Sequence, residues 1–590
     1  MNGLISIFVA ASCVVALLAA TPMDESVIAR RERLKAALHD EWEHEMRAYP
    51  EFATAVGDNR YNDRLGDNSA EFYAGEVDYA RHELEIFEAI DPAGFPEQER
   101  LSRDLMIRGL RQQIEGARFK AWEMPVDQMN GLQVGMASLP TNTTFRTARD
   151  YRDYISRLHQ IPRVFDQAIA NMRAGMRDHF MQPRYLLEKA AAQAADIAGK
   201  PVDVSPFTQP INKFPPGISE AEQKTLREAV MAAVVNDVGP AYVRLAKFLH
   251  TEYAPQGRTE DGIWALPDGD ARYRFDIKQM TTTDLGPEEI HQMGLEQVEE
   301  IEGEMVKLAR RQGFSDLASF NEHIRNDHKL YAASGEQLLS LYQHYTDQMY
   351  TKLPEMFGRL PKNKLVVVPM EAYRAPNAVP ADYSIGAGDG SRPGRINVNE
   401  YDPTHRLLLN VEAIAYHEGI PGHHLQFSIA QEQTGLPGFR RFAYYNAYSE
   451  GWAFYAERLG KEAGFYQDPY SEYGRLENEM WRSVRLVVDT GVHAKHWTRQ
   501  QMVDYFRQHT AMDEPNIESE VDRYISWPGQ ALAYKLGQMK IIELRERARR
   551  VLGSKFDLRA FHDAVLADGP LPLDVLEENM ERWIAEQKAK

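Results

Sequence analysis

Apolar residues recur at helical spacing through the first half of the chain. Every fourth position is apolar between residues 34 and 46, within an otherwise charged segment, as in a helix that buries one face. Residues 105–114 repeat the pattern more loosely, and residues 151–172 and 226–248 predict two longer helices. Five prolines between residues 199 and 219 predict a loop. This half is therefore predicted to be helical, and it is a candidate wall for a substrate channel.

The helical pattern continues after a turn-rich segment at residues 262–269. Apolar positions between residues 290 and 308 predict a long amphipathic helix. Pro287 is expected in its first turn, with Asp284 or a neighbouring threonine as its N-cap. Residues 338–356 predict another helix.

Strand character is concentrated in one place. Residues 365–369 and 395–399 are short β-prone runs, and the glycine-rich segment 383–394 between them predicts a loop. This loop contains no Gly-Lys-Ser/Thr sequence, so it does not match a phosphate-binding loop. The fold class predicted is mainly α, with one small β-sheet.

The N-terminus resembles a secretory signal peptide. Residues 4–20 form an apolar run that ends in small residues, which predicts a signal peptide over residues 1–20, cleaved near Ala20. One alternative is an uncleaved membrane anchor, and another is a lipoprotein modified at Cys13, the only cysteine of the chain. The apolar run continues well past Cys13, which disfavours the lipoprotein. Cleavage would leave a protein without cysteine, and a periplasmic or secreted location is predicted.

The composition is that of a soluble enzyme. Hydrophobic residues make up 43% of the chain and charged residues 26%, with a net charge of −19. This charge disfavours nucleic acid or an anionic membrane as a partner. We divide the mature chain into an N-terminal helical region, residues 21–255, and a catalytic region, residues 256–590, expected to form one continuous unit. The oligomeric state is not predicted.

One stretch carries three histidines and a glutamate within eight residues. His417 and Glu418 begin like the zinc signature His-Glu-x-x-His, which places two imidazoles one helical turn apart beside a general base. The fourth position after His417 is Pro421, however, and the next histidines are His423 and His424. The density of ligand-type side chains indicates a metal site with stretched spacing; the alternative is a histidine-rich helix end with imidazoles in the core.

A regular helix does not reconcile this spacing with a shared metal. His417 and His424 would lie on one face but roughly 10 Å apart along the axis, whereas each imidazole must approach a metal to about 2.0–2.1 Å. A break is therefore required, and Pro421 with Gly422 is where a helix breaks most easily. We predict His417 and His423 as ligands, with His424 as the second choice.

Two later motifs extend the pattern. The segments His417–Gln426, Tyr448–Glu457 and Pro528–Gln538 together resemble the bacterial family named domain of unknown function 885, from about residue 25 to the C-terminus. The resemblance implies a zinc metallopeptidase similar to the gluzincins. It implies a large helical metallopeptidase-like fold, a small β-sheet beside the metal-binding helix whose edge pairs with an extended peptide, Zn2+ as cofactor and a peptide as substrate. A hairpin that only supports the metal helix is the alternative for the sheet.

A catalytic zinc needs a third protein ligand. The resemblance favours Glu450 in this role. Glu457 follows it by two helical turns and is a candidate for orienting a ligand histidine. An ordinary surface pairing of Glu457 with Arg458 or Lys461 is the alternative.

The expected mechanism follows from these ligands. Glu418 is the expected general base, which takes a proton from a zinc-activated water and later delivers it to the leaving amine. Tyr534 resembles the tyrosine that stabilises the oxyanion in related helical metallopeptidases, and Tyr524 is the second candidate. For either tyrosine, a hydroxyl tied into the core is the alternative.

Four polar residues line one face of a further predicted helix. Arg482, Arg485, Asp489 and His493 follow one another at intervals of three, four and four. Arg485 is the best candidate to hold a peptide's C-terminal carboxylate, and His493 is a further candidate for contacts near the site. Alternatively, Arg485 and Asp489 form a buried structural pair.

The function predicted is zinc-dependent hydrolysis of peptide bonds, most simply in short peptides. A metal-dependent amidase acting on non-peptide amides is one alternative, and a non-catalytic, zinc-stabilised binding protein is another. Glu418 argues against the second alternative, because a purely structural zinc needs no base and fills its coordination with protein ligands.

Overall fold

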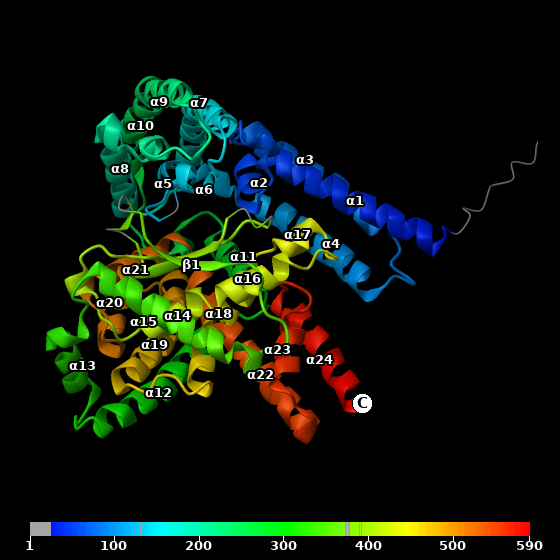
Figure 1. Cartoon of the computed structure of the whole chain (residues 1–590), viewed down its shortest axis with the longest axis vertical. Helices are drawn as coiled ribbons and strands as arrows, with labels where there is room; N and C mark the ends of the chain where they lie inside the picture. Colours follow the sequence, from blue (N-terminus) through cyan, green and yellow to red (C-terminus); the bar gives the residue numbers. More distant parts are fainter. Residues whose placement is uncertain (1–24, 130, 372–373, 376–377, 389, 391) are drawn as a thin grey trace, which may run out of the picture.

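The computed structural model describes residues 25–129, 131–371, 374–375, 378–388, 390 and 392–590. The predicted signal peptide, residues 1–20, lies outside this described part. Within it, no helix combines the length and the apolar character needed to cross a lipid bilayer. Figure 1 shows the early helices above and to the side of a larger body formed by the later helices, with β1 (Leu365–Pro369) between the two groups.

The N-terminal region is helical, as predicted. Its α-helices are α1 (Val27–Ala48), α2 (Pro50–Val56), α3 (Ala70–Glu88), α4 (Glu97–Ala117), α5 (Leu132–Ala137), α6 (Leu139–Asn142), α7 (Ala148–Asp178), α8 (Arg184–Gly199), α9 (Glu220–Ala233) and α10 (Gly239–Phe248). The segment predicted as one helix over residues 226–248 is α9 and α10, joined by a π-helical turn. The proline-rich connector contains two short 3₁₀ helices rather than loop alone.

The later helices build the body that contains the predicted site. They are α11 (Gly269–Thr281), α12 (Pro287–Arg311), α13 (Leu317–Asn326), α14 (Gly335–Met356), α15 (Val411–Glu418), α16 (His423–Gln431), α17 (Gly438–Arg441), α18 (Asn446–Glu462), α19 (Pro469–Ala494), α20 (Arg499–His509), α21 (Glu514–Ser526), α22 (Ala533–Leu552), α23 (Leu558–Leu566) and α24 (Leu573–Ala589). Helix α12 begins at Pro287, as predicted. Its N-cap is Gly286 rather than Asp284, and the Glu289 carboxylate accepts a hydrogen bond from the Gly286 amide at 2.9 Å.

The small sheet differs from the prediction in one strand. β1 and β3 (Gly394–Val398) match the two predicted runs within one residue, but they are parallel neighbours and so do not form a hairpin. A third strand, β2 (Ala381–Ser384), overlaps the start of the segment predicted as a glycine-rich loop. β2 pairs antiparallel with β3, which gives the order β1-β3-β2. Hydrogen bonding to β3 recruits this short polar segment into the sheet, although its sequence alone lacks strand character.

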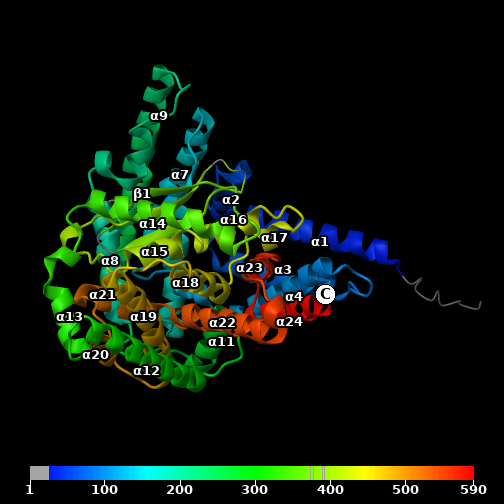
Figure 2. The same cartoon turned by 60° about the horizontal axis from the view of Figure 1, so that its bottom comes forward.

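Each group of helices has its own apolar core. In the N-terminal region, α7, α8 and α10 bury a set that includes Phe165, Leu187 and Tyr242. Figure 2 shows α7 and α9 projecting from the rest of the molecule. Helix α11 joins the two groups, because its Phe275 packs 5.2 Å from the ring of Phe119, just after α4, while the helix itself contacts α18 and α22.

Helices α18 and α22 cross at two glycines. A Cβ atom on Gly537 would lie 1.8 Å from the carbonyl oxygen of Ala447, and one on Gly451 would lie 2.5 Å from Gly537. Since no larger residue fits, the two backbones approach closely. This crossing positions Tyr534, one turn before Gly537, near His417 at the end of α15.

Candidate metal centre

The predicted break in the metal helix lies between Glu418 and His423. Helix α15 ends at Glu418 and α16 begins at His423, with a cis Ile420–Pro421 peptide between them. A Cβ on Gly422 would lie 1.9 Å from the carbonyl oxygen of His417, so only glycine allows this fold-back. The indole of Trp452 donates to the carbonyl oxygen of Pro421 at 2.9 Å and so anchors the turn to α18.

The break brings three ligand-type side chains together. Nε2 of His417 lies 3.5 Å from Oε2 of Glu450, and Nε2 of His423 lies 3.4 Å from the same oxygen. One ligand atom from each residue lies within 4.8 Å of the other two, and all three residues are buried. The two imidazole rings stand nearly perpendicular, at 89°.

These separations fit a shared metal ion. Tetrahedral ligands at about 2.0–2.2 Å from zinc lie roughly 3.3–3.6 Å from one another, close to the spacing of the imidazole nitrogens from Glu450. The pKa of Glu450 lies well below its ordinary value; burial opposes its charge, but the imidazoles of His423 and His417 outweigh the burial. The glutamate is therefore ionised, as a carboxylate ligand must be. Two imidazoles with one carboxylate are a donor set suited to zinc.

Glu457 contacts His417 from behind rather than lying at the surface. The Nδ1 atom of His417 lies 2.9 Å from Oε1 of Glu457, so the ring donates there and leaves Nε2 for a metal. Asn478 on α19 donates to the other Glu457 oxygen at 3.0 Å. Glu457 is almost fully buried, so the predicted alternative of a surface pairing is wrong.

Glu418 lies at the edge of the same group. Its Oε1 is 4.0 Å from Nε2 of His417, and burial raises its pKa to about 8. A carboxyl whose pKa is raised toward neutrality is able both to accept and to return a proton.

The second-choice ligand His424 does not join the group. Its Nδ1 accepts from the hydroxyl of Tyr383 at 3.0 Å, and its Nε2 lies 3.1 Å from the carbonyl oxygen of Asn363, to which it donates. Both ring nitrogens are therefore engaged. Burial lowers the pKa of His424 to about 4, so it is a neutral histidine that ties α16 to the sheet.

The two candidate tyrosines occupy different environments. The ring of Tyr534 stacks on His417, with centroids 6.3 Å apart, and its hydroxyl accepts from Gln530 at a long 3.4 Å. The hydroxyl of Tyr524 donates to Glu520 and accepts from Arg485 at 2.8 Å. Tyr524 is thus tied into the core, whereas Tyr534 lies beside the metal centre.

The four polar residues of the predicted row on α19 have separate partners, and Arg482 lies 3.6 Å from Glu457. Arg485 contacts Glu520 at 3.1 Å, and the structural alternative of an Arg485–Asp489 pair is wrong, because Asp489 accepts from the Tyr273 hydroxyl at 2.6 Å. Nε2 of His493 donates to the carbonyl oxygen of Tyr524 at 3.0 Å, and burial lowers the His493 pKa to about 3. His493 therefore joins α19 to α21, and Arg485 remains a prediction as a carboxylate ligand.

Several residues around the centre were not predicted. The hydroxyl of Tyr444 donates to Oε1 of Glu450 at 2.7 Å. Tyr383 on β2 stacks on His423, with centroids 6.3 Å apart, and Phe427 stacks on the same imidazole. Tyr444 lies six residues before Glu450, so its position next to the motif could have predicted a place near the site. The sequence around Tyr383 gave no such indication, because that segment is predicted to be a loop.

One edge of the sheet faces the same helices. β2 pairs with β3 on one side, and among the described residues no strand pairs with its other side. Tyr383 and the imidazoles of His423 and His424 link this strand to α16. An edge strand beside a metal helix is able to bind an extended backbone by strand addition.

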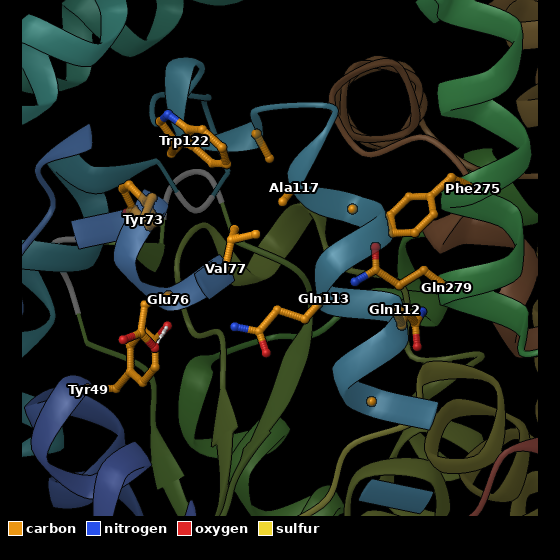
Figure 3. A pocket seen from close by; sticks show the side chains of 13 residues that line it. Tyr49, Tyr73, Glu76, Val77, Gln112, Gln113, Ala117, Trp122, Phe275 and Gln279 are labelled. Atoms are coloured by element: carbon orange, nitrogen blue, oxygen red, sulfur yellow. Dashed lines mark hydrogen bonds between the residues drawn. The ribbon is translucent and has the colours of Figure 1, made fainter. Parts of the chain in front are cut away.

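A separate cleft of about 420 Å³ lies between α3, α4 and α11 (Figure 3). The rings of Tyr73 and Trp122 stack at 5.3 Å on one side, Phe275 lies on the other, and Gln113 lies between them. Aromatic rings line this cleft, and the three candidate metal ligands are not among its lining residues.

The cleft is connected to the centre by contacting side chains. Gln279 lines the cleft, and the sulfur of the next residue, Met280, lies 3.2 Å from Nδ2 of Asn446 at the start of α18. Asn446 in turn accepts from Gln530 at 3.3 Å, and Gln530 contacts Tyr534. A series of contacts therefore runs from α11, which lines the cleft, through Asn446 and Gln530 to Tyr534.

The chain matches a bacterial protein family and is similar to two solved structures. A family described as bacterial protein of unknown function (DUF885) matches residues 50–580. Among curated proteins, none matches the chain. The crystal structure of a candidate lipoprotein from Colwellia psychrerythraea is similar, with a TM-score of 0.89 and 28% identity, over 95% of this chain and 100% of the other. A candidate lipoprotein of unknown function from Shewanella oneidensis shares the fold at a TM-score of 0.67 and 18% identity, over 94% and 99% of the two chains.

Proposed function

The chain belongs to the DUF885 family of bacterial proteins, and we propose that it is a zinc-dependent hydrolase of peptide bonds. One observation carries the proposal: His417, His423 and Glu450 converge on a common point, and the carboxyl of Glu418 lies beside them. A structural zinc would need a fourth protein ligand and no adjacent base.

The three ligands would hold the ion, and Glu457 would orient His417 through its Nδ1. Zinc bound there would supply a Lewis acid that acidifies water and polarises a carbonyl. The side chains of this protein would transfer the protons and position the substrate.

Glu418 would move the protons of the reaction. It accepts one proton from the attacking water as the water oxygen bonds to the carbonyl carbon, and it returns that proton to the amide nitrogen as the C–N bond breaks. The products are a free amine and a carboxylic acid, which then releases its proton to solvent as it ionises, and the water supplies all the added atoms. The raised pKa of Glu418 supports this role.

Tyr534 and β2 would position the reacting carbonyl. The Tyr534 hydroxyl accepts from Gln530 and interacts with Arg523, so its own proton would be available for the developing oxyanion. The open edge of β2 would bind the backbone of an extended peptide, with Tyr383 next to His423.

The descriptions of the two solved relatives support a cellular location for this chain. Both are described as candidate lipoproteins, which supports an envelope location for this chain. We propose that the chain is exported. The description of both relatives as lipoproteins also supports the alternative that Cys13 carries a lipid. Cys13 lies outside the described residues. Intact-mass measurement of the protein from a membrane fraction would distinguish a lipidated N-terminus from one cleaved near Ala20.

The function is tested by removing and restoring the metal. The exported protein is treated with 1,10-phenanthroline, dialysed, and assayed against a mixed peptide library by mass spectrometry before and after zinc is added. We expect cleavage to be lost with the chelator and restored by zinc. Cleavage that continues in the metal-free protein, or a zinc-loaded protein that cleaves no peptide, would contradict the proposal.

A further inference from the structure

Three buried arginines gather beside Tyr534. Arg482 and Arg485 lie on α19, and Arg523 lies on α21. The guanidinium carbon of Arg485 is 4.4 Å from the centroid of the Tyr534 ring, and that of Arg523 is 6.0 Å from it. Arg482 reaches the same region from the side of His417, because its Nη2 lies 3.6 Å from Glu457.

The charges of this arginine cluster are not balanced by its carboxylates. Glu457 is the ion-pair partner of Arg482, and Glu520 is shared by Arg485 at 3.1 Å and Arg523 at 3.5 Å. Three guanidinium groups thus share two carboxylates, in a place where buried charges are normally paired. The excess positive charge favours an anionic ligand.

Several N–H groups of the cluster also lack hydrogen-bond acceptors. Within the described part of the chain, Nε and Nη1 of Arg482, Nη1 of Arg485 and Nε of Arg523 are buried without a hydrogen-bond acceptor, and Nη2 of Arg523 has only the Glu520 carboxylate at a long 3.5 Å. Buried donors left without partners cost free energy, and a native protein retains them where a ligand completes them. A carboxylate matches a guanidinium in charge and in the spacing of its two oxygens.

Accessibility separates the three arginines. The side chain of Arg523 is 9% exposed, which is close to the 10% exposure of the Glu450 side chain at the metal centre. Arg485 is only 2% exposed, and Tyr524 and Glu520 already hold it. The Arg482 side chain is 6% exposed, so Arg523 and Arg482 are the two arginines more open to a substrate, and Arg485 is suited to supporting the Tyr534 ring.

The distance from the metal centre fits a short piece of peptide. Both sites are close to the Tyr534 ring: the His417 ring lies 6.3 Å from its centroid, and the guanidinium carbon of Arg523 lies 6.0 Å from it. An extended peptide spans about 3.3–3.6 Å per residue. Only a few residues therefore fit between a carbonyl at the metal centre and a group bound by Arg523.

We propose that Arg523, assisted by Arg482, binds the C-terminal carboxylate of the peptide, so that the enzyme releases short fragments from free C-termini. This inference rests on the proposed function and specifies its substrate class. It assigns the carboxylate to Arg523 in place of Arg485, the residue favoured by the sequence pattern.

The test compares one peptide with its amide. The zinc-loaded enzyme is assayed on acetyl-Ala-Ala-Phe-Ala-Ala with a free and with an amidated C-terminus. We expect the wild type to prefer the free acid. Arg523→Met should lower kcat/KM on the free acid by about 10- to 100-fold, the cost of losing a charge-assisted contact, and lower kcat/KM on the amide far less. Arg523→Lys should recover part of the preference.

Arg545→Met is the matched control, because Arg545 is also a buried arginine but is paired with Glu462 and Tyr455, which are not part of the candidate centre. This control should leave the acid-to-amide ratio unchanged. A wild type that treats acid and amide alike, or an Arg523→Met variant that loses activity equally on both, would overturn the assignment.

A binding measurement separates this inference from the proposed function. The Glu418→Gln protein is titrated calorimetrically with the same acid and amide. Tighter binding of the acid that disappears in Glu418→Gln/Arg523→Met supports the carboxylate site even if the wild type cleaves no peptide. Equal binding of acid and amide overturns it even if cleavage is found. Circular dichroism of each variant establishes that the chain is folded.

Discussion

Helices α7 and α19 are both long, but they are buried in opposite ways. Helix α7 buries one face, with Tyr154, Leu158, Ile161 and Phe165 at helical spacing against the N-terminal core. Helix α19 is buried on every side, without interruption from Tyr473 to His493. The first is the surface helix of an ordinary core, and the second runs through the centre of the molecule.

The difference lies in what is buried. The buried residues of α19 include charged or titratable side chains: Arg475, Glu477, Glu479, Arg482, Arg485, Asp489 and His493. Burying charge costs free energy unless it is paired, and replacing such pairs with apolar residues is often neutral or stabilising. We therefore infer that apolar burial in the N-terminal region serves stability, whereas polar burial around α19 serves the candidate metal centre.

Glu418→Gln should have the largest effect, and it should affect activity alone. Without a base the reaction should slow roughly 1000-fold, whereas zinc content should be unchanged because Glu418 is not a ligand. Glutamine removes a buried ionisable group, so unfolding stability should not fall. Steady-state kinetics, elemental analysis and thermal unfolding measure the three quantities.

The matched control is Glu477→Gln, which makes the same change in a buried carboxyl of α19 whose pKa burial raises to about 7. Glu477 accepts from the Ala511 amide at 3.0 Å, so this variant should lose some stability and keep its turnover. If the two variants lost activity equally, Glu418 would have no special place in the reaction.

Leu158→Ala should show the reverse behaviour. Leu158 is fully buried in the N-terminal core, so truncation should lower the free energy of unfolding by about 2–5 kcal/mol. The kcat/KM of the folded protein should stay within about twofold. Urea unfolding followed by circular dichroism gives the first value, and kinetics in the absence of urea give the second. A large loss of kcat/KM in the folded variant would show that the N-terminal region takes part in catalysis.

Tyr534→Phe should slow turnover by roughly 100-fold with little change in KM, because the hydroxyl is expected to act only on the developing oxyanion. The ring keeps its stacking on His417, so zinc content should not change. Tyr524→Phe is the comparison, since its hydroxyl holds Glu520 and Arg485 in the core. A variant in which KM rises and kcat is preserved would assign Tyr534 to substrate binding.

The sequence was sufficient where local patterns determine structure. Periodicity predicted the long helices, and the Pro421–Gly422 step predicted the break that brings His423 to His417. The sequence did not predict contacts between residues that are far apart in the chain. β2 forms because β3 offers it hydrogen bonds, and the contacts of Arg523 depend on how α21 packs against α19 and α22. The Gly451–Gly537 crossing becomes interpretable only once both helices are placed.

The smallest expected effect concerns acid sensitivity. His562 is buried and its pKa is lowered by burial to about 3, with Nδ1 donating to the Met356 carbonyl oxygen at 2.9 Å and Nε2 accepting from Tyr455. On unfolding it regains a pKa of about 6.5 and binds a proton. The unfolded state therefore binds more protons below pH 6.5, and stability falls as pH falls.

For the single His562 group this loss amounts to about 2 kcal/mol between pH 7 and pH 5. Urea unfolding of the chelator-treated protein at several pH values should show a shallower decline for His562→Gln than for the wild type. Parallel curves for the two proteins would mean that His562 is protonated to the same extent in the folded and unfolded states.

The central claim, that His417, His423 and Glu450 hold a metal ion, is tested most directly by metal content. Untagged protein is dialysed against zinc, freed of excess metal and analysed by inductively coupled plasma mass spectrometry, together with His417→Ala, Glu450→Ala and His424→Ala. The account predicts about one zinc per chain in the wild type and in His424→Ala, and almost none in the other two variants. A wild type without bound metal, or full occupancy in His417→Ala, would contradict it.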